Sequence, residues 1–295
     1  MSMTEPIETI ERLEQSCPPE SSTIPNATPN WEVLQGDSLL VLPTLKPNYY
    51  GALFTDPPYC SGGRTAGEKA KSPSDKYCSG GASGARPDFE GDSRDQRSYL
   101  AWSMLWMLQA YRLLKPQAII GVFTDWRQLP VTTDALQAAG FTWYGTVVWD
   151  KTGSCRPAMD RYANQVEYLI WGAKGKLPRR RAGDIGALPG VYHYPVKQSD
   201  KFHLTGKPTG LLVELLKIVA PGEPVLDCFG GSMTTGVGAL RRGCPFTGIE
   251  MSEYYANIGR GRLEAEAPGA EPFVMPGPPA PAPRSPMTRK HSVSA

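Results

Sequence analysis

The sequence contains no long apolar run and no cysteine motif, and each absence excludes a class of protein. No stretch approaches the roughly 20 apolar residues of a membrane-spanning helix, and the first residues lack the basic and apolar regions of a signal peptide. The six cysteines include no C-x-x-C pair, so neither a disulfide framework nor a zinc site is indicated. We therefore expect a cytosolic protein with free thiols, without a membrane anchor and without a metal.

The net charge and two absent motifs also limit the possible functions of the protein, although less strictly. The net charge is only +2, so the distribution of the basic residues matters more than their number. The sequence has no G-x-G-x-x-G segment, which weakens a nicotinamide interpretation, and no Pro-Cys nucleophile at the end of a strand, which argues against cytosine-C5 chemistry.

Alternating apolar segments predict an α/β fold, because buried strands and amphipathic helices follow one another along the chain. Such alternation is typical of right-handed crossovers and a mostly parallel sheet, with the ligand site at the carboxyl ends of the strands. Seven strands are predicted, over 31–35, 50–54, 118–123, 142–149, 165–171, 224–229 and 246–250. Helices are predicted over 39–45, capped by Ser38, and over 97–114, 130–139, 209–219, 234–242 and 254–265.

Shifts in composition predict the domain limits. Residues 29–267 are expected to form the catalytic domain, between a flexible arm, 1–28, and a disordered Pro-rich tail, 268–295. The polar segment 60–96 is too long for an ordinary connection, so it is either a mobile functional loop or disordered.

The motif Asp56-Pro57-Pro58-Tyr59 follows the apolar run 50–54 and carries the first chemical argument. An exocyclic amine is a poor nucleophile until acceptors hold its protons, because its lone pair is delocalised into the ring. Asp56 supplies a carboxylate acceptor, and Pro57 leaves its carbonyl free as a second one. Tyr59 offers a flat face for stacking on a flipped base. Alone, the motif fits equally well a strand ended by two prolines, with Tyr59 packed on the core.

A second motif, between Val225 and Glu250, has the features of a cofactor site. The strand 224–229 breaks into Gly230-Gly231-Ser232, where the backbone can approach a ligand closely, and the next helix directs free N–H groups towards a carboxylate or phosphate. Glu250 ends the following strand and can accept the two hydroxyls of a ribose. This pattern fits a dinucleotide as well as an adenosyl cofactor.

A basic cluster between residues 172 and 202 includes Tyr192, His193 and Tyr194. Such a mixture indicates phosphate contacts combined with base stacking or base-edge readout, and a solvated basic loop is the alternative. The predicted DNA-binding residues are Arg156, Arg161, Lys174, Lys176, Arg179, Arg180, Arg181, Lys197 and Lys201.

Taken together, the motifs at 56–59 and 227–232 resemble the S-adenosylmethionine-dependent amino-methyltransferases of DNA, in the beta arrangement where the catalytic motif comes first. The resemblance covers residues 30–265, and the pieces 36–37, 149–151, 165–171 and 203–208 follow in that family's order. It implies a doubly wound, mostly parallel, seven-stranded sheet of the Rossmann-like methyltransferase type, with a circularly permuted motif order. This chain differs from the usual pattern at Met233, Leu204 and Gly206, and its target-recognition insertion, 172–202, is short.

The resemblance also implies a role for each motif residue. Asp56, Pro57, Pro58 and Tyr59 would hold and stack the target base, without a covalent intermediate. Asp37 would contact the adenine of the cofactor, and Thr205 and Lys207 its methionine carboxylate. The full set of implied cofactor-binding residues is Asp37, Thr205, Lys207, Asp227, Phe229, Gly230, Gly231, Ser232, Thr234, Thr235 and Glu250.

The activity implied is transfer of a methyl group to the N6 amine of adenine in double-stranded DNA, by base flipping, in a prokaryotic or phage-infected cell. The first alternative is cytosine-N4, for which Ser commonly replaces the opening Asp. RNA or protein-glutamine methylation usually goes with Asn at that place, and a silent DNA-binding relative has no chemical reason to keep Asp56, Tyr59 and Glu250. The resemblance further admits a homodimer and a separate restriction endonuclease as partners.

Overall fold

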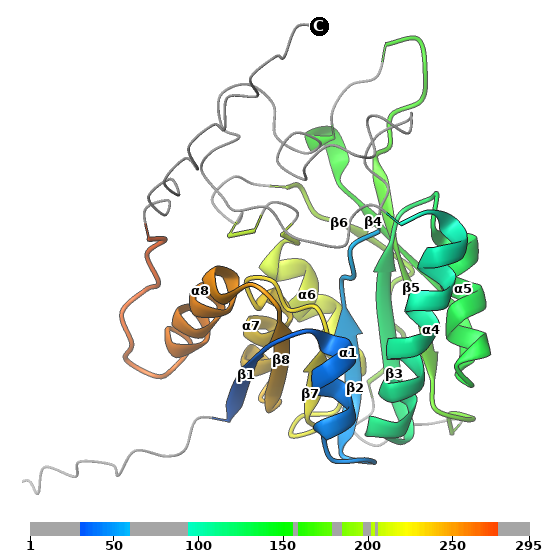
Figure 1. Cartoon of the computed structure of the whole chain (residues 1–295). Coiled ribbons are helices and arrows are strands. Elements are labelled where there is room, and N and C mark those ends of the chain that lie inside the picture. The colour runs from blue at the N-terminus through cyan, green and yellow to red at the C-terminus, as the bar shows by residue number, and fades with distance from the viewer. Residues whose placement is uncertain are drawn as a thin grey trace, which may run out of the picture.

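The central feature of the fold is one sheet, with eight strands in the part of the chain that the structure describes. The computed structural model describes residues 30–59, 94–155, 159–178, 185–196, 202–203 and 206–276. The strand order is β1-β8-β7-β2-β3-β5-β4-β6 (Figure 1). The strands are β1 (Trp31–Gln35), β2 (Tyr50–Thr55), β3 (Leu114–Thr124), β4 (Thr142–Asp150), β5 (Val166–Ala173), β6 (Val191–His193), β7 (Val225–Asp227) and β8 (Phe246–Glu250).

The sheet is mostly parallel, as predicted. Within the described residues β5 alone runs in the opposite direction, between β3 and β4, and the other neighbouring pairs are parallel. All seven predicted strands are present, but the predicted strand number is wrong, because the short β6 adds an eighth strand beside β4. Three residues within a basic, proline-containing segment give too short an apolar pattern to predict a strand.

Helices cover both faces of the sheet (Figure 1). Successive strand residues face opposite sides, so Phe54 and Leu53 belong to different buried clusters. Phe54 packs with α6 (Thr209–Leu215), α7 (Thr234–Arg241) and α8 (Glu253–Glu264), whereas Leu53 packs with α4 (Gln96–Leu113) and α5 (Leu129–Ala138). Both clusters are made of large apolar side chains, which explains why the strands read as continuous apolar runs. The helices are α1 (Ser38–Val41), α4 (Gln96–Leu113), α5 (Leu129–Ala138), α6 (Thr209–Leu215), α7 (Thr234–Arg241) and α8 (Glu253–Glu264), with 3₁₀ turns η1 (Leu42–Thr44), η2 (Thr152–Ser154) and η4 (Leu216–Ile218).

Two local predictions are wrong at element boundaries. Asp37 caps α1, since its carboxylate accepts from the backbone N–H of Leu39 at 2.9 Å, and the predicted cap Ser38 instead donates to the carbonyl of Cys228. The strand predicted over 118–123 begins earlier, since β3 starts at Leu114, directly after α4, and includes Pro116. The register shifts between Tyr50 and Ala52 there, so the missing N–H of Pro116 falls outside the regular ladder.

The two edges of the sheet differ in what they carry. We call the edge where β1, β8, β7, β2, β3, β4 and β6 end the carboxyl edge, and the opposite one the amino edge. Because β5 is antiparallel, its first residues, Val166 to Tyr168, also lie at the carboxyl edge. Both predicted motifs end at this edge. Among the described residues, no helix is long and apolar enough to cross a membrane.

Candidate active site

The two motifs meet because β2 and β7 are neighbouring strands. Leu53 pairs with Leu226, so the chain emerges from both strands at the same place. The Thr55 hydroxyl donates to Asp227 Oδ1 at 2.6 Å and accepts from the backbone N–H of Phe229 at 3.2 Å. The Phe229 N–H also donates to Asp227 Oδ1, at 3.0 Å. Thr55, which sequence analysis did not single out, therefore ties the catalytic motif to the glycine turn.

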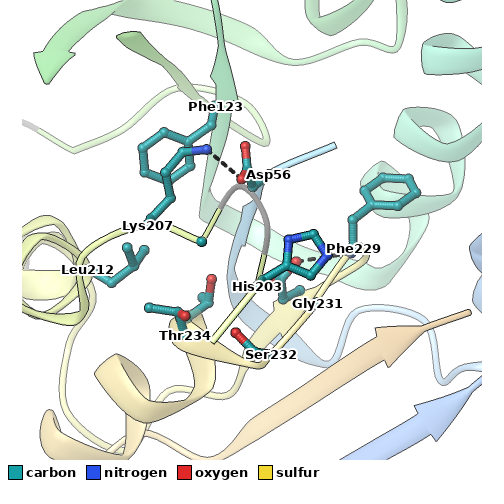
Figure 2. Close-up of a pocket in the computed structure, with 13 residues that line it drawn as sticks. Asp56, Phe123, His203, Lys207, Leu212, Phe229, Gly231, Ser232 and Thr234 are labelled. Atoms are coloured by element: carbon teal, nitrogen blue, oxygen red, sulfur yellow. Dashed lines mark hydrogen bonds and ion pairs between the residues drawn. The ribbon is translucent and has the colours of Figure 1, made fainter. Parts of the chain in front are cut away.

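A cavity that is open to solvent lies between the two motifs (Figure 2). The additional lining residues, which were not predicted, are Phe123, His203, Gly206 and Leu212. The predicted residues in its wall are Asp56, Lys207, Asp227, Phe229, Gly230, Gly231, Ser232, Thr234 and Thr235.

Glu250 supports the glycine turn from the end of β8. Its Oε2 accepts from the N–H of Gly231 at 2.9 Å, and its Oε1 accepts from the N–H of Ser252 at 2.8 Å. Gly231 has φ +51°, a conformation that glycine adopts without strain. Burial raises the pKa of Glu250, although these hydrogen bonds lower it. Gly36, which precedes Asp37, donates its N–H to the backbone carbonyl of Glu250 at 3.0 Å, so Asp37 follows β1 next to the end of β8.

Met233 explains how the turn tolerates a long side chain where a glycine is usual. Its backbone is left-handed, with φ +58° and ψ +37°, and its side chain is fully buried. A Cβ added to Gly230, Gly248 or Gly259 would lie only 2.3–2.4 Å from atoms of Met233. Three glycines therefore leave the space that this side chain fills.

A buried arginine, which the sequence did not indicate, organises the start of α7. Arg262 Nη1 donates to the carbonyl of Ser232 at 2.5 Å, to the Ser232 hydroxyl at 3.1 Å and to Thr234 Oγ1 at 2.9 Å. The side chains of Ser232 and Thr234 are therefore engaged in holding the turn. Asp227 accepts from Thr55 and Thr235, yet burial outweighs these bonds and raises its pKa to about 6.

Both carboxylate oxygens of Asp56 are occupied by donors from the chain. Lys207 Nζ lies 2.5 Å from Oδ2, and the Tyr59 hydroxyl donates to Oδ1 (Figure 2 shows the contact with Lys207). The Lys207 ammonium also lies 5.2 Å from the ring centres of Tyr59 and Phe123. Lys207 also lines the cavity, and its role at the methionine carboxylate stays a prediction.

A second carboxylate, Glu167 on β5, completes this charged group. Its Oε2 lies 3.3 Å from Lys207 Nζ and 3.5 Å from the Tyr59 hydroxyl, and its Oε1 lies 3.2 Å from Lys151 Nζ. Neither Glu167 nor Lys151 was predicted to belong to the site. Lys151 and Glu167 lie in the segments 149–151 and 165–171, which follow the order of the family's motifs. That match was the sequence signal that could have assigned them to the site.

The pKa values in this group follow from burial and from the alternating charges. Burial raises the pKa of Asp56, Lys207 lowers it, and the Glu167 carboxylate raises it again, so that the balance is upward. For Glu167, burial raises the pKa, but the ammonium groups of Lys207 and Lys151 outweigh it and leave the pKa lowered. Burial lowers the pKa of Lys207, but the two carboxylates leave it raised. Burial and Asp56 raise the pKa of Tyr59 well above its usual value, so the phenol stays a donor.

The structure separates the predicted DNA-binding residues. Arg161 is exposed on the connection between β4 and β5, at the carboxyl edge. Lys174 and Lys176 follow β5 at the amino edge, where Lys174 Nζ donates to Asn48 Oδ1 and to the carbonyl of Leu114, each at 2.9 Å. These two lysines are not brought together with the cavity. Outside the described residues lie Arg156, Arg179, Arg180, Arg181, Lys197, Lys201 and the predicted cofactor residue Thr205.

The aromatic residues of the basic cluster have other tasks. Tyr192 is buried in the core beside β4, which is incompatible with the predicted stacking on a base. Tyr194 packs against the same cluster, and its carbonyl accepts from Trp149 Nε1 at 2.8 Å. His193 is exposed, and its Nδ1 lies 2.9 Å from Asp150 Oδ2.

Comparison with known proteins gives consistent matches along the described core. The profile of the DNA methylase family matches residues 51–260. YubD of Escherichia coli (strain K12), named as a methylase, is 29% identical over 233 residues, which cover 79% of this chain and 89% of YubD.

Two solved structures share the fold. TTHA0409 of Thermus thermophilus, described as a DNA modification methylase in complex with S-adenosyl-L-methionine, has a TM-score of 0.57 and 19% identity, over 81% of this chain and 95% of its own. The cytosine-N4-specific PvuII DNA methyltransferase has a TM-score of 0.59 and 18% identity, over 79% of this chain and 87% of its own. At such identity these likenesses show the fold alone.

Proposed function

The chain belongs to the N6/N4 DNA methylase family, and from that premise we propose that it methylates the N6 amine of adenine within a short double-stranded DNA motif. The methyl donor is S-adenosylmethionine, and the transfer is direct. The observation that carries this proposal is the position of Asp56. Its carboxylate forms part of the wall of the same cavity as the glycine turn 229–232, so an amine held there lies beside whatever the turn binds.

The cavity fits a nucleoside cofactor that carries charges of both signs. Asp56, Asp227 and the Lys207 ammonium line it, and Glu250 lies directly behind Gly231. Acidic and basic groups in one wall suit a sulfonium cation next to a carboxylate, and the consecutive glycines Gly230 and Gly231 leave room for close approach to the backbone. When bound there, S-adenosylmethionine supplies an electrophilic methyl group. Phe229, Gly230 and Gly231 would form one wall of its site, with Glu250 and Asp37 at the sugar and the adenine.

The chain's own residues prepare the amine. Asp56 would accept one amine proton, and the carbonyl of the buried Pro57 would accept the other, which localises the lone pair on nitrogen. Partial burial strengthens the hydrogen bond to Asp56, whose side chain is 24% exposed, because charges interact more strongly where less water surrounds them. Tyr59 stands next to Asp56 and would stack on the base. A base inside a duplex cannot reach a carboxylate in such a cavity, so the nucleotide must be flipped out.

The carboxyl edge also offers a surface for the duplex. Arg161 lies there between Met159 and Tyr162, whose side chains are 80% and 100% exposed. An arginine flanked by exposed apolar side chains suits phosphate contact combined with base contact. Arg156, Arg179–Arg181, Lys197 and Lys201 remain predictions from the sequence for this surface, as do the homodimer and the separate endonuclease. Lys174 and Lys176 are left out of it because they lie at the amino edge.

Cytosine-N4 is the second candidate product, since the PvuII methyltransferase with that specificity shares the fold. The Asp that opens the motif, rather than Ser, favours adenine. Single-molecule modification sequencing of DNA from cells that express the wild-type chain or Asp56→Ala distinguishes the two. Adenine-N6 marks in one short motif, absent in Asp56→Ala, are expected, and cytosine-N4 marks would change the base but keep the mechanism.

The same variant tests the role of Asp56. Asp56→Ala should abolish methylation and keep cofactor binding, measured by calorimetry with S-adenosylmethionine. An equal loss of both would overturn the assigned role. If the wild-type chain leaves no marks although it binds the cofactor, RNA substrates and then a silent scaffold become the better explanations.

A further inference from the structure

The arrangement around Asp56 presents a difficulty for the proposed chemistry. Tyr59 donates to one carboxylate oxygen and Lys207 to the other, so an amine proton would have to share an oxygen with a donor of the chain or displace it. Lys207 is held inside the protein, since only 6% of its side chain is exposed, and Tyr59 is partly buried. A buried donor that loses its acceptor is strongly unfavourable, and a buried ammonium more so. Displacement of both donors by the amine is therefore favoured if they find another acceptor.

Glu167 is within reach of both of these donors. The same oxygen, Oε2, lies 3.3 Å from Lys207 Nζ and 3.5 Å from the Tyr59 hydroxyl. The other oxygen, Oε1, is held by Lys151 at 3.2 Å, which fixes the carboxylate in place. Trp149, the β4 partner of Glu167 in the sheet register, packs in the core and stiffens the strand pair.

We infer that Glu167 is a positioning residue, which accepts Lys207 and the Tyr59 hydroxyl when the target amine takes their places on Asp56. This inference rests on the proposed function. The exchange moves two hydrogen bonds from one carboxylate to the other, and no bond is broken other than these. Without the charge of Glu167, the Lys207 ammonium keeps Asp56 as its single carboxylate partner and competes there with the amine.

The pH dependence of the rate distinguishes a charged Glu167 that acts on Asp56 from a Glu167 that only supports the fold. A purely structural role leaves the acidic limb of the rate profile unchanged. The groups that face Asp56 are Tyr59 from its own segment, Glu167 from β5, Lys207 from the segment before α6 and Asp227 from β7, with Lys151 behind Glu167. The negative charge of Glu167 raises the pKa of Asp56. Its removal makes Asp56 easier to ionise, so the acidic limb of the rate profile should move to lower pH.

The test compares wild type, Glu167→Gln and Glu167→Asp in single-turnover methylation of a duplex that contains the motif found by sequencing. In Glu167→Gln the rate at saturating DNA should fall on the order of 100-fold, as expected when a reacting group is blocked or misplaced. Affinity for S-adenosylmethionine, measured by calorimetry, should not change. Glu167→Asp keeps the charge and should recover part of the rate together with the wild-type acidic limb.

Two further variants sharpen the comparison. Glu223→Gln removes a carboxylate from an equally short lysine pair at the amino edge, with 2.6 Å between Lys115 Nζ and Glu223 Oε2, and should leave the rate unchanged. Tyr59→Phe removes one of the two donors, so the loss caused by Glu167→Gln should be smaller in that background than in wild type.

Three results would overturn the inference. One is wild-type activity in Glu167→Gln, and another is an equal loss in Glu167→Gln and Glu167→Asp with the acidic limb unmoved. The third is loss of cofactor binding in parallel with activity, which would mean that Glu167 only supports the fold. If the wild-type chain itself methylates no DNA, the proposed function fails, and this result is distinct because it appears before any variant is compared.

Discussion

Each edge of the sheet carries a short lysine–carboxylate pair, and only one of the two pairs belongs to a site. At the amino edge, Lys115 and Glu223 are 2.6 Å apart and each is more than one-third exposed. At the carboxyl edge, Lys207 and Asp56 are 2.5 Å apart, but Lys207 is buried and Glu167 adds a second carboxylate. Distance alone does not distinguish the two pairs. Burial of the lysine and a second carboxylate within its reach do, because both are costly and are retained where chemistry requires them.

The strongest way to break this comparison is to remove the lysine from each pair. Lys207→Met leaves the partly buried Asp56 carboxylate without its cation, beside Glu167, which keeps only Lys151, and should lower the free energy of unfolding by about 3 kcal/mol at pH 7. Lys115→Met should cost at most about 1 kcal/mol, because that pair is solvated. Urea unfolding of both variants measures the difference. Equal losses of stability in Lys207→Met and Lys115→Met would mean that the Lys207–Asp56 pair contributes no more than a solvated surface pair.

Acidification should reduce the first of these losses and not the second. Protonation of either Asp56 or Glu167 removes the repulsion that Lys207→Met creates, so this variant should approach the stability of wild type as the pH falls towards 5. The Lys115→Met difference should stay constant over the same range. A gap that does not change with pH in Lys207→Met would contradict the assignment of two charged carboxylates.

Asp227 gives a second contrast between the edges, through the pH dependence of stability. Burial raises its pKa from 3.8 to about 6. The folded chain therefore binds a proton that the unfolded chain releases, and stability falls as the pH rises through this window. At about 1.4 kcal/mol per pKa unit, the effect reaches ~3 kcal/mol.

Asp227→Asn should remove this slope while Glu223→Gln at the amino edge keeps it. The measurement is the denaturant midpoint of each protein between pH 4 and pH 7, expressed as the difference from wild type. A slope that persists in Asp227→Asn would assign the effect to another group.

The smallest expected effect concerns DNA affinity. Arg161→Ala at the carboxyl edge should reduce the slope of log affinity against log salt by about 1, because one phosphate contact is lost. Lys176→Ala at the amino edge should leave the slope unchanged. Titrations with a duplex at several salt concentrations give both slopes. If Lys176→Ala changes the slope and Arg161→Ala does not, the DNA lies on the other edge.

The sequence was sufficient for the parts of the fold that depend on contiguous residues. The apolar runs 50–54 and 246–250 predicted buried strands, and the residues that end them predicted which side chains stand at the carboxyl edge. The amphipathic stretch 97–114 predicted α4 to within one residue at each end. These features are local, because the apolar face of a strand or helix is visible in the spacing of that element's own residues.

The rest depends on pairing between distant segments, which no local pattern specifies. Glu167 reaches Lys207 only because β5 runs antiparallel between β3 and β4 and so begins at the carboxyl edge. In the sequence Thr55 is only the residue that follows an apolar run, and its role appears when β7 brings Asp227 within hydrogen-bond distance. Arg262 reads as an ordinary helix residue, yet its guanidinium is buried and holds Ser232 and Thr234. The partners of a buried charge become visible only in three dimensions.

Met233 has a consequence for which substitutions this turn can accept together. A Cβ at position 259 would lie 2.3 Å from Met233 Cγ, in the stem of the side chain, whereas at positions 230 and 248 the nearest atom is the sulfur, at 2.4 Å, near the flexible end. Position 259 should therefore depend most strongly on the residue at 233. Among homologous sequences, those with a small residue at the position of Met233 should accept alanine or larger residues at the position of Gly259, whereas those with methionine should not. We expect the positions to behave as one unit, so that exchange of a single member between relatives fails where exchange of all four succeeds.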